Sequence, residues 1–314
     1  MKRIILLSII CFALHSASAQ EEAVLGHYLF NPVLINPAAS GFDQEHHGIF
    51  MNIRSGYTNF PGAPKTYALS YNGAVGKRLG IGGMMYTENV ASLTYYRGQL
   101  SFAFRYEAND LEMAAGFATQ FNRARIDDED YLANPNGIYD PDDEILAIFA
   151  DGERVFDASL GIYGTYKKKL VFGLSFPSLI RARLDEIEGQ SSNSGLSHFT
   201  AFFGGDLSVD DYKIKLQPWV LVKRLRSTPF QVDFNMLASF LQERLITGLK
   251  YTAGAEGNFG VLLGTKYNAV RFIYSYDVHL GDFQQYNGGS HEITVNFLLK
   301  RNKGKFDRSK KYRK

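Results

Sequence analysis

The sequence predicts an all-β protein, an antiparallel up-and-down transmembrane β-barrel of about 14 strands. Three observations support this prediction: an N-terminal export signal, apolar and polar residues that alternate with a period of two, and connections that are short at one end of the strands and longer at the other. Successive strand residues face opposite sides of a sheet, so this period gives each strand one apolar and one polar face. A membrane barrel needs such an apolar outer band.

Residues 1–19 have the order of parts of a signal peptide. Two basic residues precede an apolar run from Ile4 to Leu14, and small residues then offer a cleavage site before Gln20. The run is too short to cross a bilayer as a helix, which takes about 20 residues. Cys11 lies inside this run, so the mature chain has no disulfide and no cysteine-ligated metal. We therefore expect export to the cell outer membrane.

Alternating residues mark the segments that we expect to be strands. In 269–278, for example, Arg271, Ser275 and Asp277 share the face opposite a row of apolar side chains. A soluble β-sandwich alternates in the same way, so alternation alone does not decide between the two classes. The predicted strands span residues 46–55, 65–73, 78–87, 94–107, 110–123, 154–167, 169–176, 197–209, 211–223, 229–240, 244–252, 256–267, 269–278 and 290–299.

The lengths of the connections favour the membrane. Short turns follow the even-numbered strands, whereas most other connections are longer, including 124–153 and 177–196; the connection at 253–255 is the exception. Outer-membrane barrels have short periplasmic turns and longer outer loops. Backbone groups in hydrocarbon must be satisfied within the protein, so the sheet has to close on itself. An even number of strands places both ends of the barrel on the periplasmic side.

We expect four parts along the chain: the signal peptide 1–19, an N-terminal segment 20–45 at the periplasmic rim or in the lumen, the barrel 46–299, and a basic periplasmic tail 300–314. The tail carries a net charge of +8, whereas the residues between Gln20 and Leu299 carry −8. We expect the tail to be disordered rather than to bind an acidic partner. The acidic body and the predicted export argue against a nucleic-acid partner.

Candidate metal and catalytic residues give weak patterns. The acidic loop 124–153 could hold Ca²⁺, but its spacing does not match an EF-hand, and a solvated loop is the favoured interpretation. His46 and His47 would face opposite sides of a strand. Ser290 and His291 near Asp277 lack a nucleophile turn and an oxyanion site. We therefore predict a protein that is not an enzyme and that has no cofactor and no bound metal.

Glycines at 80, 82 and 83 do not form a phosphate-binding loop, because the Gly-Lys-Ser/Thr ending and a following helix are missing. We interpret the cluster as strand where the wall bends or where a neighbour packs closely.

Two Pro/Asn-rich motifs do not resemble ordinary strands. The first, Tyr28–Gly41, contains two Asn-Pro steps, which favour turns and disfavour helix in the residue before each proline. The second is a tight turn that leads into the second strand. The residues that we single out in these motifs are Asn31, Pro32, Asn36, Pro37, Phe60, Pro61, Gly62, Pro64, Lys65 and Thr66. We interpret both motifs as structural, and an additional role as an interaction surface stays open.

With these two motifs, the segments Gly173–Pro177, Tyr274–Asp277 and Gly289–Glu292 complete a pattern that resembles the PorP/SprF family of Bacteroidota, which serves type IX secretion and gliding motility. The resemblance spans essentially the whole mature chain, and it adds Asp277, His291 and Glu292 to the candidate partner-binding or structural residues. It implies a non-enzymatic outer-membrane barrel. Its partners would be periplasmic secretion-ring proteins and a peptidoglycan-binding protein, or a secreted adhesin with a type B C-terminal domain.

Two function classes remain open at this point, besides a less favoured outer-membrane hydrolase. In the first, the barrel is a membrane anchor or partner within the secretion or gliding apparatus, surrounded by outer-membrane lipids. In the second, it is a pore for small solutes, with inward charges such as Arg105, Arg271, Asp233 and Asp277 setting selectivity. A lumen filled by the N-terminal segment would argue against the pore.

Overall fold

Strands form over most of the chain where alternation predicted them. The computed structural model describes residues 25–126, 152–184, 195–209, 214–225, 230–254 and 257–302. Their strands are β1 (His46–Ser55), β2 (Lys65–Val75), β3 (Leu79–Val90), β4 (Leu93–Ala108), β5 (Leu111–Ile126), β6 (Glu153–Tyr166), β7 (Leu170–Arg183), β8 (Phe199–Gly205), β9 (Leu207–Val209), β10 (Ile214–Arg224), β11 (Gln231–Phe240), β12 (Leu245–Ala253), β13 (Asn258–Tyr267), β14 (Val270–His279) and β15 (Ser290–Lys300).

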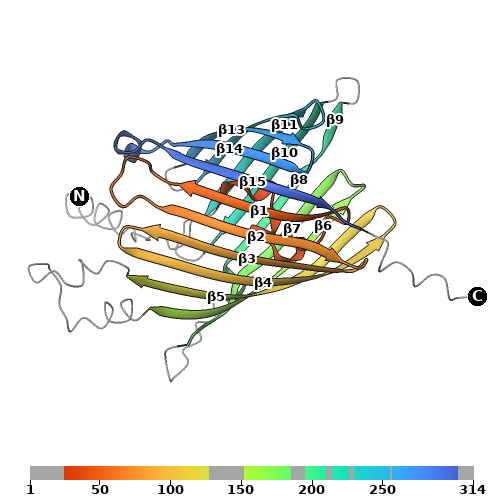
Figure 1. Cartoon of the computed structure of the whole chain (residues 1–314), viewed down its shortest axis with the longest axis horizontal. Helices are drawn as coiled ribbons and strands as arrows, with labels where there is room; N and C mark the ends of the chain where they lie inside the picture. The colour runs from red at the N-terminus through yellow and green to blue at the C-terminus, as the bar shows by residue number, and fades with distance from the viewer. Residues whose placement is uncertain are drawn as a thin grey trace, which may run out of the picture.

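The strands form one antiparallel sheet that closes on itself (Figure 1). Neighbours in sequence pair in order, and β1 pairs with β15 along its whole length, with Met51 opposite Val295. Both β8 and β9 pair with β10, so they act as one interrupted strand, and 14 strands surround the lumen. The predicted antiparallel barrel is therefore confirmed. Within the described residues no helix has the length and apolar character to cross a membrane.

The two ends of the barrel differ. We call the end where β1 begins and β15 ends the short-turn rim, because the turns 76–78, 109–110, 167–169, 241–244 and 268–269 lie there. Asn109 and Asn268 begin the tightest of these turns with positive φ, which asparagine tolerates. The opposite end is the long-connection rim.

Large apolar side chains cover the outside of the wall. Met85 is 71% exposed and Leu100 is 60% exposed, whereas the inward neighbours of Leu100, Gln99 and Ser101, are buried. Outward tyrosines lie near both ends of the strands, where a ring with a hydroxyl suits the boundary between lipid and water. They are Tyr67, Tyr96 and Tyr251 near the long-connection rim and Tyr106, Tyr166 and Tyr267 near the short-turn rim.

Two predicted strands differ most from the observed ones, whereas other bounds shift by up to three residues. β7 continues to Arg183, although we predicted its end at residue 176, before Pro177. The register between β6 and β7 shifts between Ala158 and Leu160, so a bulge accommodates the proline, which cannot donate a ladder hydrogen bond. The predicted strand 197–209 is interrupted at Asp206.

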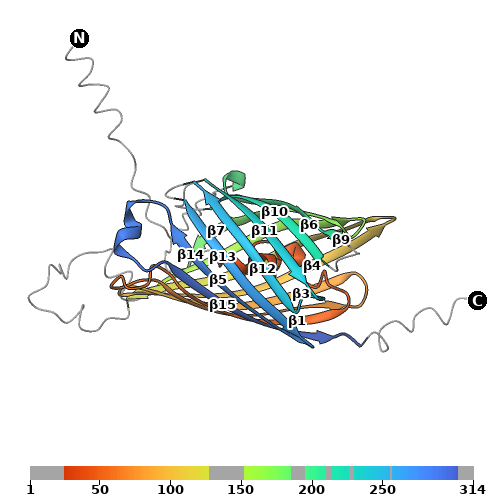
Figure 2. The ribbon, with the colours of Figure 1, turned by 90° about the horizontal axis from the view of Figure 1, so that it is seen from above.

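Residues 25–43 lie inside the barrel, and we call them the lumen segment. They contain three 3-10 turns, η1 (Gly26–Leu29), η2 (Pro32–Leu34) and η3 (Pro37–Ala39), which are seen within the wall in Figure 2. The segment crosses the lumen once: Gly26 contacts Glu292 near the long-connection rim, and Gly41 lies against Gly73 and Gly80 near the short-turn rim. Short 3-10 turns η4 (Gly195–Ser197) and η6 (Asp282–Tyr286) lie between strands near the long-connection rim.

Candidate functional site

The two Asn-Pro steps give the lumen segment its shape. Asn31 and Asn36 have extended φ values of −139° and −150°, as expected for residues that precede proline. Each proline then begins a 3-10 turn, where its missing N–H costs nothing. The Asn36 side chain accepts a hydrogen bond from the backbone N–H of Ala38 at 2.9 Å, which caps η3. The segment is therefore a series of fixed turns.

Glycines of the wall receive the second half of the segment, Pro32–Asp43. A Cβ at Gly116 would lie 2.5 Å from the Ala38 Cα, and a Cβ at Gly80 would collide with the backbone carbonyl of Ser40. At Gly161 it would collide with the side-chain oxygen of Asn36. Only glycine admits so close an approach of two backbones. The interpretation of the Gly80 cluster as a close-packing position is thus supported by its contact with Ser40.

Hydrogen bonds fix this half as well. The Asn36 amide donates to the carbonyl oxygens of Ile162 at 2.7 Å and Leu174 at 3.3 Å. The Ser175 hydroxyl donates to the carbonyl of Ile35 at 2.6 Å, and the hydroxyls of Ser40 and Ser101 lie 2.7 Å apart. Apolar contacts complete the packing, with Ala38 and Ala39 fully or nearly fully buried against wall residues that include Tyr163 and Phe202.

Buried charges hold the first half, Leu25–Asn31. The Glu292 carboxylate, which is fully buried, accepts hydrogen bonds from the backbone N–H groups of Gly26 at 2.7 Å and His27 at 3.1 Å. Arg54 lies 3.1 Å from Glu292 and 3.2 Å from Asp277, and Lys250 lies 2.8 Å from Asp277. Two acids and two bases from four strands thus balance each other around the start of the segment.

The His27 ring continues this network. Its Nδ1 lies 2.7 Å from the Thr294 hydroxyl and its Nε2 lies 2.9 Å from the Ser275 hydroxyl. The ring is only 2% exposed. Both ring nitrogens are therefore within hydrogen-bonding distance of wall hydroxyls, which orients η1 against β14 and β15.

A second polar cluster surrounds Tyr28. The Tyr28 hydroxyl donates to Asp233 at 3.3 Å and accepts from the Asn235 amide at 2.8 Å. Asp233 also accepts from Lys223 at 2.9 Å and from Thr252 at 2.8 Å. Each of these side chains is at most 10% exposed. A buried charge is tolerated only when it is paired and hydrogen-bonded, and this cluster meets that condition.

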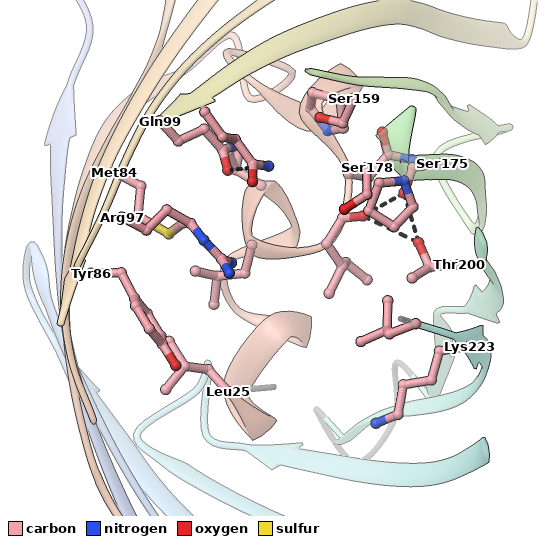
Figure 3. Close-up of a pocket in the computed structure, with 18 residues that line it drawn as sticks. Leu25, Met84, Tyr86, Arg97, Gln99, Ser159, Ser175, Ser178, Thr200 and Lys223 are labelled. Atoms are coloured by element: carbon pink, nitrogen blue, oxygen red, sulfur yellow. Dashed lines mark hydrogen bonds between the residues drawn. The ribbon is translucent and has the colours of Figure 1, made fainter. Parts of the chain in front are cut away.

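Little space remains beside the lumen segment. The cavity beside it has a volume of about 80 Å³. Leu25, Tyr86 and Arg97 bound the cavity on one side, and Thr200 and Lys223 bound it on the other (Figure 3). Such a volume holds a few ordered water molecules. The lumen at this level is therefore filled mainly by protein.

The second Pro-rich motif lies at the long-connection rim. The Gly62 carbonyl accepts a hydrogen bond from Ala91 at 2.9 Å. In the residues just before the motif, Thr58 exchanges backbone hydrogen bonds with Gly288 and Gly289 at 2.6 and 2.8 Å, and the Tyr57 N–H donates to the Ser290 hydroxyl. We call residues 57–66 and 280–291 the outer motif surface.

The structure places the predicted site residues in three groups. The first group belongs to the lumen segment and contains Asn31, Pro32, Asn36 and Pro37. The second group lies at the outer motif surface and contains Phe60, Pro61, Gly62, Pro64, Lys65 and Thr66, of which Thr66 is buried on the inner face of the barrel. Asp277 and Glu292 are brought together on the inner face by Arg54, whereas His291 points outward and contacts Tyr274 and Tyr276. His27, Arg54 and Lys250 were not predicted from the sequence. They are single polar residues, and the sequence shows no signal for their partners.

The catalytic arrangement considered from the sequence does not form. Ser290 is buried toward the lumen, whereas the neighbouring His291 side chain lies on the outer face, as alternation in a strand requires. His46 contacts Asp43 and His47 contacts Tyr71, so this pair also diverges. The described part of the chain contains no group of three His, Cys, Asp or Glu that could hold a metal. The acidic part of loop 124–153 lies outside the described residues.

Comparisons with solved structures give low similarity. The toluene transporter TbuX of Ralstonia pickettii has a TM-score of 0.48 at 10% identity and covers 85% of this chain and 92% of its own. The toluene transporter TodX of P. putida scores 0.47 at 9% identity, covering 87% and 94%. The outer membrane protein Omp33 of Acinetobacter baumannii scores 0.47 at 7% identity, covering 82% and 99%. No curated protein matches the sequence.

The family comparison is more informative. The model of the type IX secretion system membrane protein family PorP/SprF matches residues 17–297, which include the lumen segment, nearly the whole barrel wall and both Pro-rich motifs. A closed antiparallel barrel with an apolar outer face is the architecture expected of a membrane protein. The chain therefore belongs to the PorP/SprF family of type IX secretion system membrane proteins.

Proposed function

We propose that this chain is a closed, non-enzymatic barrel of the outer membrane that anchors a secreted partner of the type IX secretion or gliding apparatus at the cell surface. In this proposal the signal peptide is removed, the short-turn rim faces the periplasm and the outer motif surface faces outward. The observation that carries the proposal is the lumen segment, which fills the middle of the barrel with fixed turns and leaves a cavity of about 80 Å³ beside them. A barrel built to conduct solutes would need an open lumen.

The outer motif surface supports the anchoring role. Hydrogen bonds between the two connections hold its backbone in place, so little conformational entropy is lost on binding. It presents large apolar side chains above the strands: Phe60 is 45% exposed, Leu280 is 57% exposed and Tyr286 is 65% exposed. Aromatic residues of this kind are enriched at the centres of protein interfaces.

A photo-crosslinking residue at position 286 tests the proposal in native membranes. Position 267 is the matched control, because Tyr267 is 74% exposed but lies at the short-turn rim. We expect position 286 to capture one secreted surface protein that depends on the secretion system, and position 267 not to capture it. Recovery of the barrel alone from position 286, in cells that secrete normally, would contradict the proposal.

A role with the periplasmic ring proteins is the second candidate, and the charged short-turn rim favours it. Turns there present Lys77, Arg78 and three consecutive lysines at 167–169. In this case position 267 or its neighbours would capture periplasmic secretion components. The two roles are compatible because they use opposite ends of one closed barrel.

A further inference from the structure

A basin opens at the short-turn rim below the lumen segment. It has a volume of about 580 Å³, within the range of ligand-binding clefts. Its walls come from the turn 76–78, the end of β4, the start of β5, the turn 167–169 and the residues that follow β15. Residues 44 and 45, which join the lumen segment to β1, also line it. The barrel wall and the connection between the lumen segment and β1 therefore build the basin together.

The basin carries an excess of positive charge. Five basic residues and three acidic residues line it: Lys77, Arg78, Arg105, Lys168 and Arg301, against Glu45, Glu107 and Glu112. The Arg105 side chain binds Glu107 and Glu112 at 2.6 and 2.5 Å and stacks over Phe42, so these two acids are already engaged. The Nε of Arg105 is buried and has no hydrogen-bond acceptor among the described residues.

Arg301 is fixed in the basin wall by hydrogen bonds to neutral acceptors. Its guanidinium donates to the Gly76 carbonyl at 2.6 Å and to the Gln44 side-chain oxygen at 3.0 Å, and both acceptors are neutral. Within the described chain neither Arg301 nor the exposed Arg78 has a carboxylate partner. Arg301 is thus held in position while its charge stays uncompensated. A guanidinium in this state binds a carboxylate strongly and with fixed geometry.

We propose that this basin binds an acidic peptide segment of a periplasmic protein. Carboxylate side chains of the segment would pair with Arg301 and Arg78, where the charge is uncompensated. The basic residues from Lys300 to Lys314 begin at the basin wall and carry a net charge of +8, which would accelerate the encounter with an acidic partner. This inference rests on the proposed orientation of the barrel, and it assigns the recognition step to the basin rather than to the tail alone.

Binding of a fluorescent polyglutamate peptide to the purified full chain in detergent micelles tests the proposal. We expect the double variant Arg78→Glu, Arg301→Gln to weaken binding by about tenfold, equivalent to about 1.4 kcal/mol. The control Arg224→Glu makes the same charge change as Arg78→Glu, but at the long-connection rim, and should leave binding unchanged. If Arg301→Gln disturbs the rim, Arg78→Glu alone should still weaken binding, because Arg78 is exposed.

Three results would overturn the proposal. An equal loss with Arg224→Glu would show that only net charge matters. Loss of binding on removal of residues 303–314, with no effect of the basin variants, would assign binding to the tail. Displacement of the peptide by inorganic phosphate at equal concentration would indicate a phosphate site instead.

Labelling separates these outcomes from failure of the proposed function. The expected mature chain has no cysteine, so Arg78→Cys gives a single thiol. A membrane-impermeant maleimide should label it only after the outer membrane is permeabilised. Labelling in intact cells would place the basin outside and overturn both the periplasmic partner and the proposed orientation of the barrel, whereas failure of the basin variants to weaken peptide binding would overturn the basin site alone.

Discussion

The two halves of the lumen segment are held by different kinds of contact. Near the long-connection rim, Glu292, Arg54 and neighbouring charged side chains bind the first half through ion pairs and hydrogen bonds. Near the short-turn rim, wall glycines such as Gly80 and Gly116 admit the second half so closely that no side chain fits between. The difference indicates that the first half is fixed by charge and the second by shape. Each half should therefore respond to a different substitution.

Glu292→Gln should cause the largest single-residue effect. It leaves Arg54 near one acid instead of two and weakens the acceptor for the N–H groups of Gly26 and His27. Removing one partner of a buried ion pair costs about 3–5 kcal/mol. Urea unfolding in lipid vesicles measures this loss, and Glu107→Gln is the control because the Glu107 side chain is 60% exposed. Equal losses in the two variants would contradict a charge-held first half.

Gly116→Val should have the next largest effect. Its side chain would meet the backbone of Ala38, so the second half must shift or the wall must deform, at about 1–3 kcal/mol. Gly98→Val is the matched control, since Gly98 lies on the outer face with nothing within 4 Å of an added Cβ. Proteolysis of the lumen segment in vesicles should increase in Gly116→Val alone. Equal proteolysis of the two variants would contradict a second half that is fixed by shape.

Asn36→Ala should have a smaller effect on the second half. The change removes two hydrogen bonds to the wall and the cap of η3, and it leaves the carbonyls of Ile162 and Leu174 without this donor. An unsatisfied buried acceptor costs about 1–3 kcal/mol, so part of that range is expected. Asn36→Asp should be worse than Asn36→Ala in the same unfolding experiment, because a carboxylate cannot donate to the carbonyls. The reverse order would be inconsistent with these contacts.

The smallest effect concerns the pH dependence of an ion pair that Arg271 forms. Arg271 also contacts the lumen segment, because its guanidinium carbon lies 5.6 Å from the centre of the Phe30 ring. Burial alone would raise the pKa of Glu243 in the turn 241–244, but Arg271 and Lys266 hold that pKa below its ordinary value. The ionised Glu243 therefore stabilises the fold at a pH above its ordinary pKa, and this stabilisation is lost as the pH falls through the lowered pKa. We expect about 0–1 kcal/mol, because the carboxyl is partly exposed. Hydrogen exchange at this turn should lose its acid response in Glu243→Gln.

Much of the wall could be predicted because its signal is local. β1 (His46–Ser55) and the start of β15 at Ser290 coincide with the predicted bounds, since alternation depends only on neighbours in sequence. The length of β7 was missed because Pro177 suggests the end of a strand, and the bulge that accommodates it depends on β6. The length of a strand that contains a proline is therefore decided by its pairing partner and not by the local sequence pattern.

The lumen segment was predicted less completely. Its Asn-Pro turns and its two alternative places, the periplasmic rim or the lumen, follow from residues 28–41 alone. Its direction through the barrel cannot be predicted from these residues, because that direction depends on the contact between Gly26 and Glu292, which lie 266 positions apart in the sequence. The candidates Asp277 and Glu292 came from a family resemblance, whereas their shared partner Arg54 appears only when the barrel closes.

The central claim is that residues 25–43 close the lumen and that the barrel is an anchor rather than a pore. Single-channel conductance in planar bilayers tests it directly, with the full mature chain compared with a variant that lacks these residues. Heat-modifiable migration would confirm that the variant still forms a barrel. We expect no steady conductance from the full chain and stable open channels from the variant. Steady conductance of the full chain, unchanged by the deletion, would contradict it.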